Sequence, residues 1–526
     1  MPNQVRHGKR LYKQMAMEVA VRNPERYKGI LFVISIYENK ILDDDCILEI
    51  YADLFLSKVI DSNNIDVDSS NKQKIKTFIK ENLSHKNEWG FPTGYQAAFT
   101  RYLKTLSELG FIYTQYNDPI AISEVAKIWL KNEIEDAEVF ALQCMRFWRK
   151  SPYRRVLNDH NYFRFILEVL LKLKGENKTL SYPQFILSLF SDNGNVEEFI
   201  DLIKNYRYGN DIDKMYNFIV SKYGNKDELH PKVNKQSTVC NDYGNTVFRV
   251  LQLTGLITIN SNSGILTLSI NEYKENLLKK LLNQNFVISE DAKEDEMLYF
   301  NEIGSWNTTL KNLIISSRAD EQSSVENYNE VMKNIIKTNN INVQQLTDWL
   351  CDLSNNKNDT SVFWYIQKPL KFEFFVSLIM YLNYGDKLQI TPNYKTDTNG
   401  IPYQHAPGNI GDIVLSSDEV KWLIEVTLIR SKIQQYNKET SDCIRHFKQN
   451  IDLKNYLTFI APYVHPDTVN YYENEIINLI KKKQTSTYIK PYNTIEFIEL
   501  SNKKSLLQDM EQYKDRIYKE LRESLS

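Results

Sequence analysis

Hydrophobic and polar positions alternate along two short segments near the C-terminal end of the chain, GNIGDIVL and KWLIEVTL. This two-residue period predicts two strands, and the polar SSDE between them (residues 416–419) has the length and composition of a hairpin turn. We expect an antiparallel pairing that sets Asp412 opposite Leu423. Asp412 and Glu425 then become diagonal neighbours on one face, roughly 7–8 Å apart at the backbone.

The chemistry of that face depends on what separates the two acids. Two neighbouring carboxylates repel unless a cation lies between them, and all-oxygen ligation suits Mg²⁺ better than Zn²⁺. We therefore expect Asp412 and Glu425 to share a metal ion, the alternative being a surface hairpin with two solvated acids. The opposite face of the second strand is expected to be buried through Trp422, Ile424, Val426 and Leu428.

Helical periodicity flanks the hairpin on both sides. Residues 429–447 carry apolar side chains on one face, and their polar face can orient a water or a phosphate oxygen, unless it is simply solvated. That polar face comprises Lys432, Gln435, Glu439, Asp442 and His446.

Upstream, Glu373 interrupts the apolar run LKFEFFVSLIMYL, where a buried carboxylate predicts a metal, a partner or a shifted pKa. Helix with acid, strand with Asp, strand with Glu, then helix is the order of the PD-(D/E)xK nuclease core.

An internal repeat occupies the N-terminal half of the chain. The segment AAFTRYLKTLSELGFIYTQYNDPIAISEVAKIWL has a distant counterpart in NTVFRVLQLTGLITINSNSGILTLSINEYKENLL. Each predicts a helix that ends at a glycine (Gly110 or Gly255), then a strand, a polar turn and a return strand. Leading helices are expected at 44–59 and at 182–190, the latter after an N-cap at Ser181. This is the back half of a winged helix, which can place a helix in the major groove of DNA but also mediates protein contacts.

Two local clusters of cations accompany the repeat, RFWRKSPYRR (residues 146–155) and RHGKRLYK near the N-terminus. Such clusters can clamp DNA phosphates, and the alternative is a solvated helix face.

The stretch from Pro369 through His446 resembles the catalytic domain of the AlwI family of type IIS restriction endonucleases and their nicking relatives. The matching pieces are FEFF, DTNGIPYQHAPGNIGDIVL, WLIEVTLIRSKIQQYNKET and CIRHF, and the N-terminal NPERYKGILFVI resembles the opening segment of the same family. The resemblance implies Mg²⁺ held by Asp412 and Glu425, with the Val426 carbonyl as a further ligand. The implied catalytic set is Glu373, Asp412, Glu425, Glu439 and His446.

One position departs from the wider nuclease pattern. Thr427 stands two residues after Glu425, where a lysine is usual. The role of activating water or stabilising charge must then pass to Glu439, Gln435, His446 or the metal itself.

Composition sets limits without identifying a function. A chain of 526 residues can bury two to four cores, and its net charge of −2 requires any positive potential for DNA to be local. Five cysteines without metal-site spacing favour a reducing cytoplasm and argue against zinc. The N-terminus MPNQVRHGKR lacks an apolar targeting core, and no apolar run approaches the roughly 18 residues of a membrane span. We expect a cytoplasmic protein without a membrane partner.

Polar breaks predict a multidomain α+β protein of four parts. Residues 1–173 and 174–295 are expected to form tandem winged-helix-like recognition subdomains, 296–353 a helical linker, and 354–526 an α/β catalytic domain of PD-(D/E)xK type. Together with the resemblance, this predicts a Mg²⁺-dependent type IIS endonuclease, or a strand-specific nicking large subunit, that cuts double-stranded DNA a few base pairs outside a short asymmetric site. Two alternatives stay open: a winged-helix regulator without nuclease activity and a structure-selective repair nuclease.

The expected partners follow from the single set of carboxylates. One set serves one DNA strand, so cleavage of the second strand needs either a transient homodimer or a separate small subunit. The resemblance also implies a cognate methyltransferase in the same system.

Overall fold

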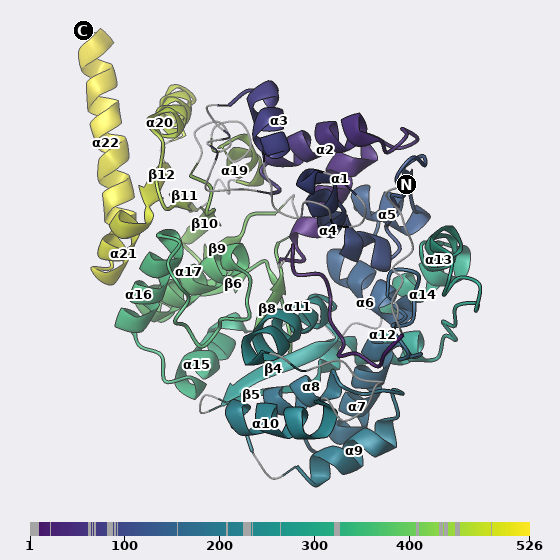
Figure 1. Ribbon diagram of the computed structural model, residues 1–526. Helices are drawn as coiled ribbons and strands as arrows, with labels where there is room; N and C mark the ends of the chain where they lie inside the picture. Colours follow the sequence, from purple (N-terminus) through teal and green to yellow (C-terminus); the bar gives the residue numbers. More distant parts are fainter. Residues whose placement is uncertain are drawn as a thin grey trace. The chain divides into compact units, whose positions relative to one another are not determined.

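The computed structural model divides into two compact units (Figure 1). The first comprises residues 1–259 and 265–322, and the second residues 260–264 and 323–526. The structure describes residues 10–21, 23–60, 65, 67, 70–81, 88, 91, 93–154, 156–206, 209–224, 233, 235–262, 265–319, 327–406, 410–430, 435, 440–447, 453–484 and 486–525. Among them, no helix combines the length and the apolar character needed to cross a membrane.

Two groups of elements in the first unit follow the same order. The first group is α1 (Arg26–Ser35), α2 (Asp44–Leu56), α3 (Lys72–Glu81), α4 (Gly94–Glu108), β1 (Ile112–Tyr113), β2 (Ala121–Ile122) and α5 (Glu124–Leu130). The second is α7 (Tyr162–Gly175), β3 (Leu180–Ser181), α8 (Tyr182–Ser188), α9 (Val196–Lys204), α10 (Ile212–Tyr223), a π-helix (Ser237–Tyr243), α11 (Gly244–Leu253), β4 (Ile257–Asn262), β5 (Ile265–Ile270) and α12 (Glu275–Leu282). Helix α6 (Asp136–Arg146) separates the groups, and α13 (Glu296–Ile303) and α14 (Thr308–Ala319) follow them.

Both predicted strand pairs are present. Strands β1 and β2 are antiparallel, and an extended bridge joins Ile41 to Pro119 beside them. In the second group β5 lies between β3 and β4, with Leu180 opposite Leu268. The predicted leading helices are α2 and α8, and the predicted cap is confirmed because Ser181 accepts a hydrogen bond from the Gln184 amide. In each group the leading helix, the helix that ends at glycine and the two-stranded return follow in the predicted order. The short extended segment before each leading helix was not predicted.

In each group, the helix that leads into the two-stranded return is enclosed. No residue of α4 or α11 is exposed, and even the polar Glu108 is fully buried. Within the first unit, the Tyr299 hydroxyl donates to the Glu108 carbonyl, and α11 packs against α6. Neither helix therefore presents an open face that matches the predicted major-groove helix.

The predicted phosphate clamp at residues 146–154 is wrong. Arg146 and Arg149 are buried, and their guanidinium groups donate to backbone carbonyls, including Ile303 and Ser191. Arg154 pairs with Glu108, and Lys150 lies beside Glu290. These cations are internal or paired, which also removes the alternative of a solvated helix face. Arg155 and residues 6–9 of the N-terminal cluster lie outside the described residues, and the Arg10 guanidinium donates to Glu294.

The second unit is built around one five-stranded sheet, in the order β12-β11-β10-β9-β6. Its elements are α15 (Tyr328–Thr338), α16 (Val343–Ser354), α17 (Lys368–Tyr384), β6 (Gln389–Pro392), β7 (Lys395–Thr396), β8 (Pro402–Gln404), β9 (Ile413–Ser416), β10 (Val420–Val426), α19 (Thr440–His446), β11 (Lys454–Ala461), α20 (Pro466–Lys481), β12 (Thr487–Asn493), α21 (Thr494–Asn502) and α22 (Leu506–Leu525). Strands β6, β9 and β10 are antiparallel neighbours, whereas β10, β11 and β12 run parallel.

The residues predicted as one helical linker, 296–353, are divided between the two units. Helices α13 and α14 belong to the first unit, and α15 and α16 belong to the second. The four-part division of the chain stays a prediction.

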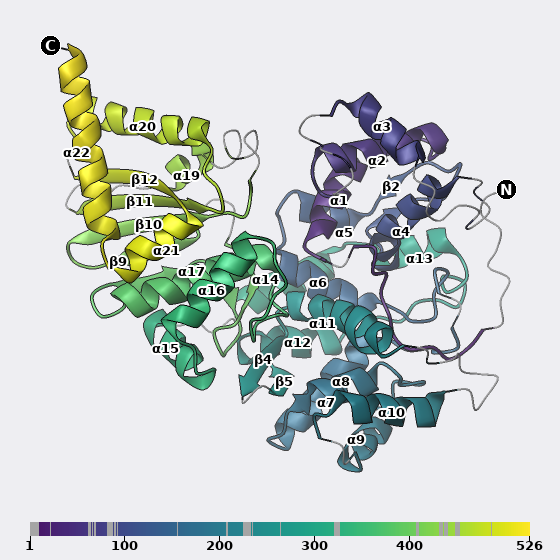
Figure 2. The ribbon, with the colours of Figure 1, turned by 60° about the vertical axis from the view of Figure 1, so that its left-hand side comes forward.

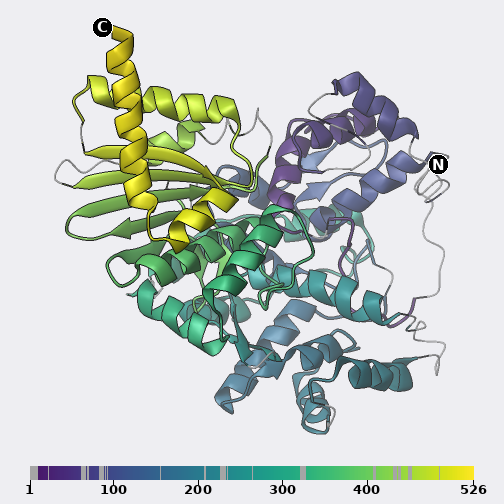
Figure 3. The ribbon, with the colours of Figure 1, turned by 90° about the vertical axis from the view of Figure 1, so that its left-hand side faces the viewer.

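Helices cover both faces of this sheet. Figure 2 shows α20 on one side of β10 to β12 and α21 and α17 on the other, and Figure 3 shows the strands as a layer with the yellow C-terminal helix α22 alongside. On one face Leu423 packs into a cluster with Phe459 and Tyr472. On the other, the Trp422 indole is buried and donates to the Thr458 hydroxyl. Trp422 and Ile424 are buried as predicted, whereas Val426 and Leu428 are half-buried.

After the hairpin, the sequence also predicts strands at YLTFIAPYVH and NTIEFIEL, and these two predictions had different outcomes. The segment YLTFIAPYVH contains most of β11, which continues the central sheet as predicted. The segment NTIEFIEL, also predicted as a strand, is instead helix α21. The Asn493 side chain accepts a hydrogen bond from the Glu496 amide and so caps the first turn.

The two repeat glycines have the left-handed backbone that the predicted helix ends require. The φ angles are +68° at Gly110 and +65° at Gly255. A Cβ atom at Gly110 would also lie 2.3 Å from the Ile303 Cγ1 atom, so both conformation and space demand glycine there.

We therefore expect Gly110→Ala to lower the free energy of unfolding by more than about 2 kcal/mol, because left-handed strain and overpacking each cost at least about 1 kcal/mol. Urea unfolding measures this. The matched control is Gly175→Ala at the end of α7, where an added Cβ meets nothing within 4 Å. Equal stability of the two variants would contradict the expectation.

Candidate active site

Asp412 and Glu425 lie at one end of the β9–β10 pair. Leu423 is opposite Val414, and Ile424 is opposite Ile413. The predicted pairing of Asp412 with Leu423 is therefore wrong by two residues, since the chain reverses within a tighter turn in which the Ser417 amide donates to the Val420 carbonyl. Continued by one pair, the observed register brings Asp412 opposite Glu425. A two-residue shift keeps every side chain on its face, so the predicted sharing of one face survives and the acids are closer than predicted.

Asp412 is the centre of a concentration of negative charge. Its Oδ2 atom accepts a hydrogen bond of 2.8 Å from the Val426 amide. Burial raises the pKa of Asp412 well above its usual range, and the nearby carboxylates of Glu373 and Glu425 raise it further. Three acids from α17, from the segment before β9 and from β10 therefore converge.

Glu373 is buried on α17, as predicted, and has a partner that the sequence did not reveal. The Nδ1–H group of His405, just after β8, donates to Glu373 Oε1 at 2.5 Å. The second oxygen, Oε2, is buried without a hydrogen-bond partner among the described residues. A buried carboxylate oxygen in that state is an available ligand atom.

Glu425 is held by a second histidine. The Nδ1–H group of His446, on α19, donates to Glu425 Oε1 at 2.9 Å. Cys443 and Phe447 anchor α19 in the core beneath the sheet. On the other side, a Cβ atom at Gly411 would lie 2.8 Å from Glu425 Oε1, so the neighbouring chain approaches the carboxylate closely. His446 thus lies where it was predicted, beside the carboxylate pair.

The predicted polar face after β10 is only partly at the site. Gln435 is fully buried and donates to the Ile429 and Tyr463 carbonyls, while its Oε1 accepts from the His465 amide. The prediction that Gln435 could activate water is therefore wrong, because its amide group is used to join loops. Glu439, Lys432 and the side chain of Asp442 lie outside the described residues.

Thr427, which stands where a lysine was expected, does not replace one. Its Oγ1 atom accepts from the Ile429 amide at 3.2 Å, and its own amide donates to the Ile460 carbonyl. The threonine shapes the exit from β10.

The donor set fits a divalent cation. It consists of carboxylate oxygens, one of them buried and unpartnered, around Asp412, whose pKa is raised by burial and by the neighbouring carboxylates. In the described part of the chain, no three His, Cys, Asp or Glu side chains are already spaced to hold one ion together. A cation would therefore take two carboxylates, from Asp412 and Glu425, and complete its shell with a carbonyl such as that of Val426, with water or with substrate oxygens.

His405 is the site residue that sequence reasoning missed. It lies 32 residues after Glu373, and no helical or strand spacing joins the two positions. The only available signal was its place in YQHAPG, a few residues before the Asp412 strand.

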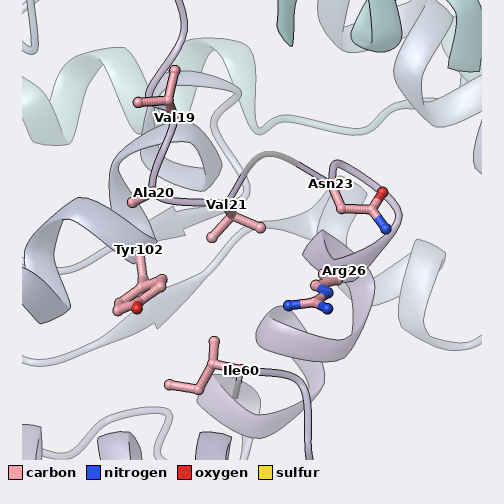
Figure 4. Close-up of a pocket in the computed structure, with 7 residues that line it drawn as sticks. All are labelled: Val19, Ala20, Val21, Asn23, Arg26, Ile60 and Tyr102. Atoms are coloured by element: carbon pink, nitrogen blue, oxygen red, sulfur yellow. The ribbon is translucent and has the colours of Figure 1, made fainter. Parts of the chain in front are cut away.

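A cavity in the first unit offers no comparable chemistry. It has a volume of about 300 Å³ and lies between the N-terminal segment, α1, α4 and the end of α2 (Figure 4). Its lining is Val19, Ala20, Val21, Asn23, Arg26, Ile60 and Tyr102, with no carboxylate or imidazole.

Three solved structures with low similarity to the chain are endonucleases or parts of endonucleases. The small subunit of the heterodimeric restriction endonuclease R.BspD6I is 19% identical, with a TM-score of 0.25, over 34% of this chain and 87% of that chain. The BpuJ1 endonuclease binding domain, solved in complex with pyrene- and phenanthrene-modified DNA, is 15% identical, with a TM-score of 0.33, over 52% of this chain and 90% of that chain. Restriction endonuclease FokI is 11% identical, with a TM-score of 0.24, over 95% of this chain and 97% of that chain.

The family comparison is decisive where these structural likenesses are weak. No curated protein matches the chain. The model of the AlwI restriction endonucleases matches residues 107–359 and 330–500, which include Glu373, Asp412, Glu425 and His446. The chain therefore belongs to the AlwI restriction endonuclease family, a family of DNA endonucleases.

Proposed function

We propose that this family member is a Mg²⁺-dependent type IIS restriction endonuclease, or a strand-specific nicking endonuclease, that hydrolyses one DNA phosphodiester a few base pairs outside a short asymmetric site. The observation that carries the proposal is the convergence of Glu373, Asp412 and Glu425 at one end of the central sheet, with a raised pKa at Asp412. The order α17, β9, β10 and α19 around it supports a core of PD-(D/E)xK type.

Each residue has a distinct part in the proposed chemistry. Asp412 and Glu425, with the Val426 carbonyl, would hold the ion, and Glu373 would position the ion or the attacking water. A bound Mg²⁺ supplies a Lewis acid for the phosphate and lowers the pKa of water. His446 fixes the Glu425 carboxylate through its 2.9 Å hydrogen bond. Glu439, outside the described residues, is assigned with His446 to orient the nucleophile or the scissile phosphate.

The first unit is proposed to read the DNA sequence. Its two groups of elements follow the order of winged-helix-like subdomains, and helices between residues 296 and 353 would link them to the catalytic core. Because α4 and α11 lack exposed residues, base contacts would come from other segments of the first unit. A transcription regulator, the rival function, has no need for three mutually repelling acids held together in a buried site.

The partners follow from the number of sites. The described residues contain one such set of carboxylates, which suits one strand of double-stranded DNA. Cutting the second strand would need a transient homodimer or a separate small subunit, because an asymmetric sequence offers no two-fold axis. A cognate methyltransferase would protect the host DNA, and the pair would act in the cytoplasm.

We expect Asp412→Asn or Glu425→Gln to reduce Mg²⁺-dependent cleavage by at least about a thousandfold, because each removes a charge on which the ion depends. Specific DNA binding, measured by gel shift in Ca²⁺, should stay within about twofold, since neither residue belongs to the first unit.

The matched control for these variants is Asp418→Asn, an exposed acid at the turn of the same hairpin. It should cut at the wild-type rate. Cleavage by purified Asp412→Asn or Glu425→Gln at the wild-type rate would show that the ion is held elsewhere.

The raised pKa of Asp412 gives a stability prediction for the metal-free protein. Below the ordinary pKa of aspartate, this carboxyl is protonated in both the folded and the unfolded states. Between that value and the raised folded pKa, the unfolded state ionises first, so rising pH destabilises the fold. We therefore expect Asp412→Asn to raise the melting temperature in EDTA at neutral pH and to flatten its pH dependence. A lower melting temperature that keeps the wild-type pH dependence would contradict this cause.

A nick should be the first product on supercoiled plasmid. If cutting the second strand needs a separate small subunit, nicked circles should persist when this protein is the only one added. With self-association, linear DNA should lag behind nicked DNA and increase more than proportionally with protein concentration. A gel time course over a range of concentrations distinguishes these routes. Linear DNA without a nicked intermediate, at a rate strictly proportional to protein, would mean that one chain cuts both strands.

A further inference from the structure

Each of the three converging carboxylates has one oxygen held by an N–H group from a different part of the second unit. The His405 ring, after β8, holds Glu373, the Val426 amide in β10 holds Asp412, and the His446 ring on α19 holds Glu425. The first of these contacts is the shortest, at 2.5 Å, and joins residues 32 positions apart. The three acids are thus oriented before any ion or DNA arrives.

Glu373 depends on such a contact more than a surface acid would. Its helix is fixed by burial, but the terminal torsion of a glutamate side chain is broad, so the helix alone does not orient the carboxylate. A hydrogen bond to one oxygen selects one orientation and stabilises the charged form. With Oε1 occupied by His405, Oε2 is the atom left buried without a partner.

We propose that His405 is a positioning residue of the endonuclease, which orients Glu373 through its Nδ1–H group so that Oε2 is presented to the ion or the attacking water. The proposal deepens the function proposed above and rests on it. His405 contributes orientation, and the carboxylate of Glu373 contributes the ligand or acceptor atom.

The exposure of His405 separates this role from a purely structural one. Its side chain is 38% exposed, whereas that of Glu373 is 6% exposed and those of His446 and Glu425 are both 9% exposed. Truncating a side chain at the rim removes little buried area from the core. Loss of His405 should therefore act on the site more than on the fold.

The test uses the full-length protein with His405→Ala and His405→Asn. Asparagine keeps an N–H donor close to the position of Nδ1 but lacks the outer ring nitrogen. Single-turnover cleavage in Mg²⁺ is measured together with binding of Mn²⁺ alone, followed by the electron paramagnetic resonance of the free ion. His405→Ala should lower the cleavage rate, the Mn²⁺ affinity or both by about 10- to 100-fold, as expected for a residue that orients a metal-site carboxylate. His405→Asn should recover cleavage to within about fivefold of wild type, because its amide still donates to Glu373.

Two controls make the result specific. His465→Ala removes another partly exposed histidine of the second unit, which caps α20, and should leave both readouts unchanged. In a double-mutant cycle, His405→Ala should cost little when added to Glu373→Gln, since residues that act as one unit are not additive.

Three outcomes would overturn the proposal: wild-type cleavage and Mn²⁺ binding in His405→Ala, an asparagine variant as impaired as the alanine variant, or additive losses in the cycle. The cleavage measurements in these outcomes require that the wild-type protein cuts DNA with Mg²⁺. A wild-type protein that does not cut would instead refute the proposed function, while the Mn²⁺ titration would still report whether His405 shapes the site.

Discussion

Mutual repulsion of three carboxylates is the constraint on which the second unit depends. Two unit charges 4 Å apart interact by about 4 kcal/mol at an effective dielectric constant of about 20, and burial increases the cost of each charge. Burial raises the pKa of Asp412 most, and the repulsion from Glu373 and Glu425 raises it further. The surrounding structure holds the acids in place despite it. The sheet is buried on both faces, α17 is largely buried, and Gly411 lies close to the Glu425 carboxylate.

The sequence predicted the arrangement of acids better than it predicted their register. Alternation along GNIGDIVL and KWLIEVTL places Asp412 and Glu425 on one face in any register that differs by two residues, so the conclusion survived a wrong pairing. Glu373 was predictable because burying a single carboxylate in a long apolar run is costly unless a partner or a metal stabilises it. His405 and the role of Gln435 were not predictable, because both depend on loops that bring together distant residues, and loop paths leave no periodic signal.

Cations illustrate the same limit in the first unit. RFWRKSPYRR has the composition of a phosphate clamp, yet Arg146 and Arg149 donate inward to backbone carbonyls that need partners. Composition records which donors are present, whereas their direction depends on which carbonyls the tertiary fold leaves unpaired. The helix order and the left-handed Gly110 and Gly255 were predictable because helix caps and chain reversals are local.

The threonine at position 427 explains why imidazole and amide donors matter in this site. Its hydroxyl accepts from the Ile429 amide, so it does not enter the group of acids, and no ammonium group stands at that position. Among the described contacts, the groups that hold Glu373, Asp412 and Glu425 are two imidazole N–H groups and one peptide N–H group. These donors fix the orientation of the carboxylates. The geometry of the site therefore rests on β10 itself and on donors that the loop after β8 and helix α19 supply.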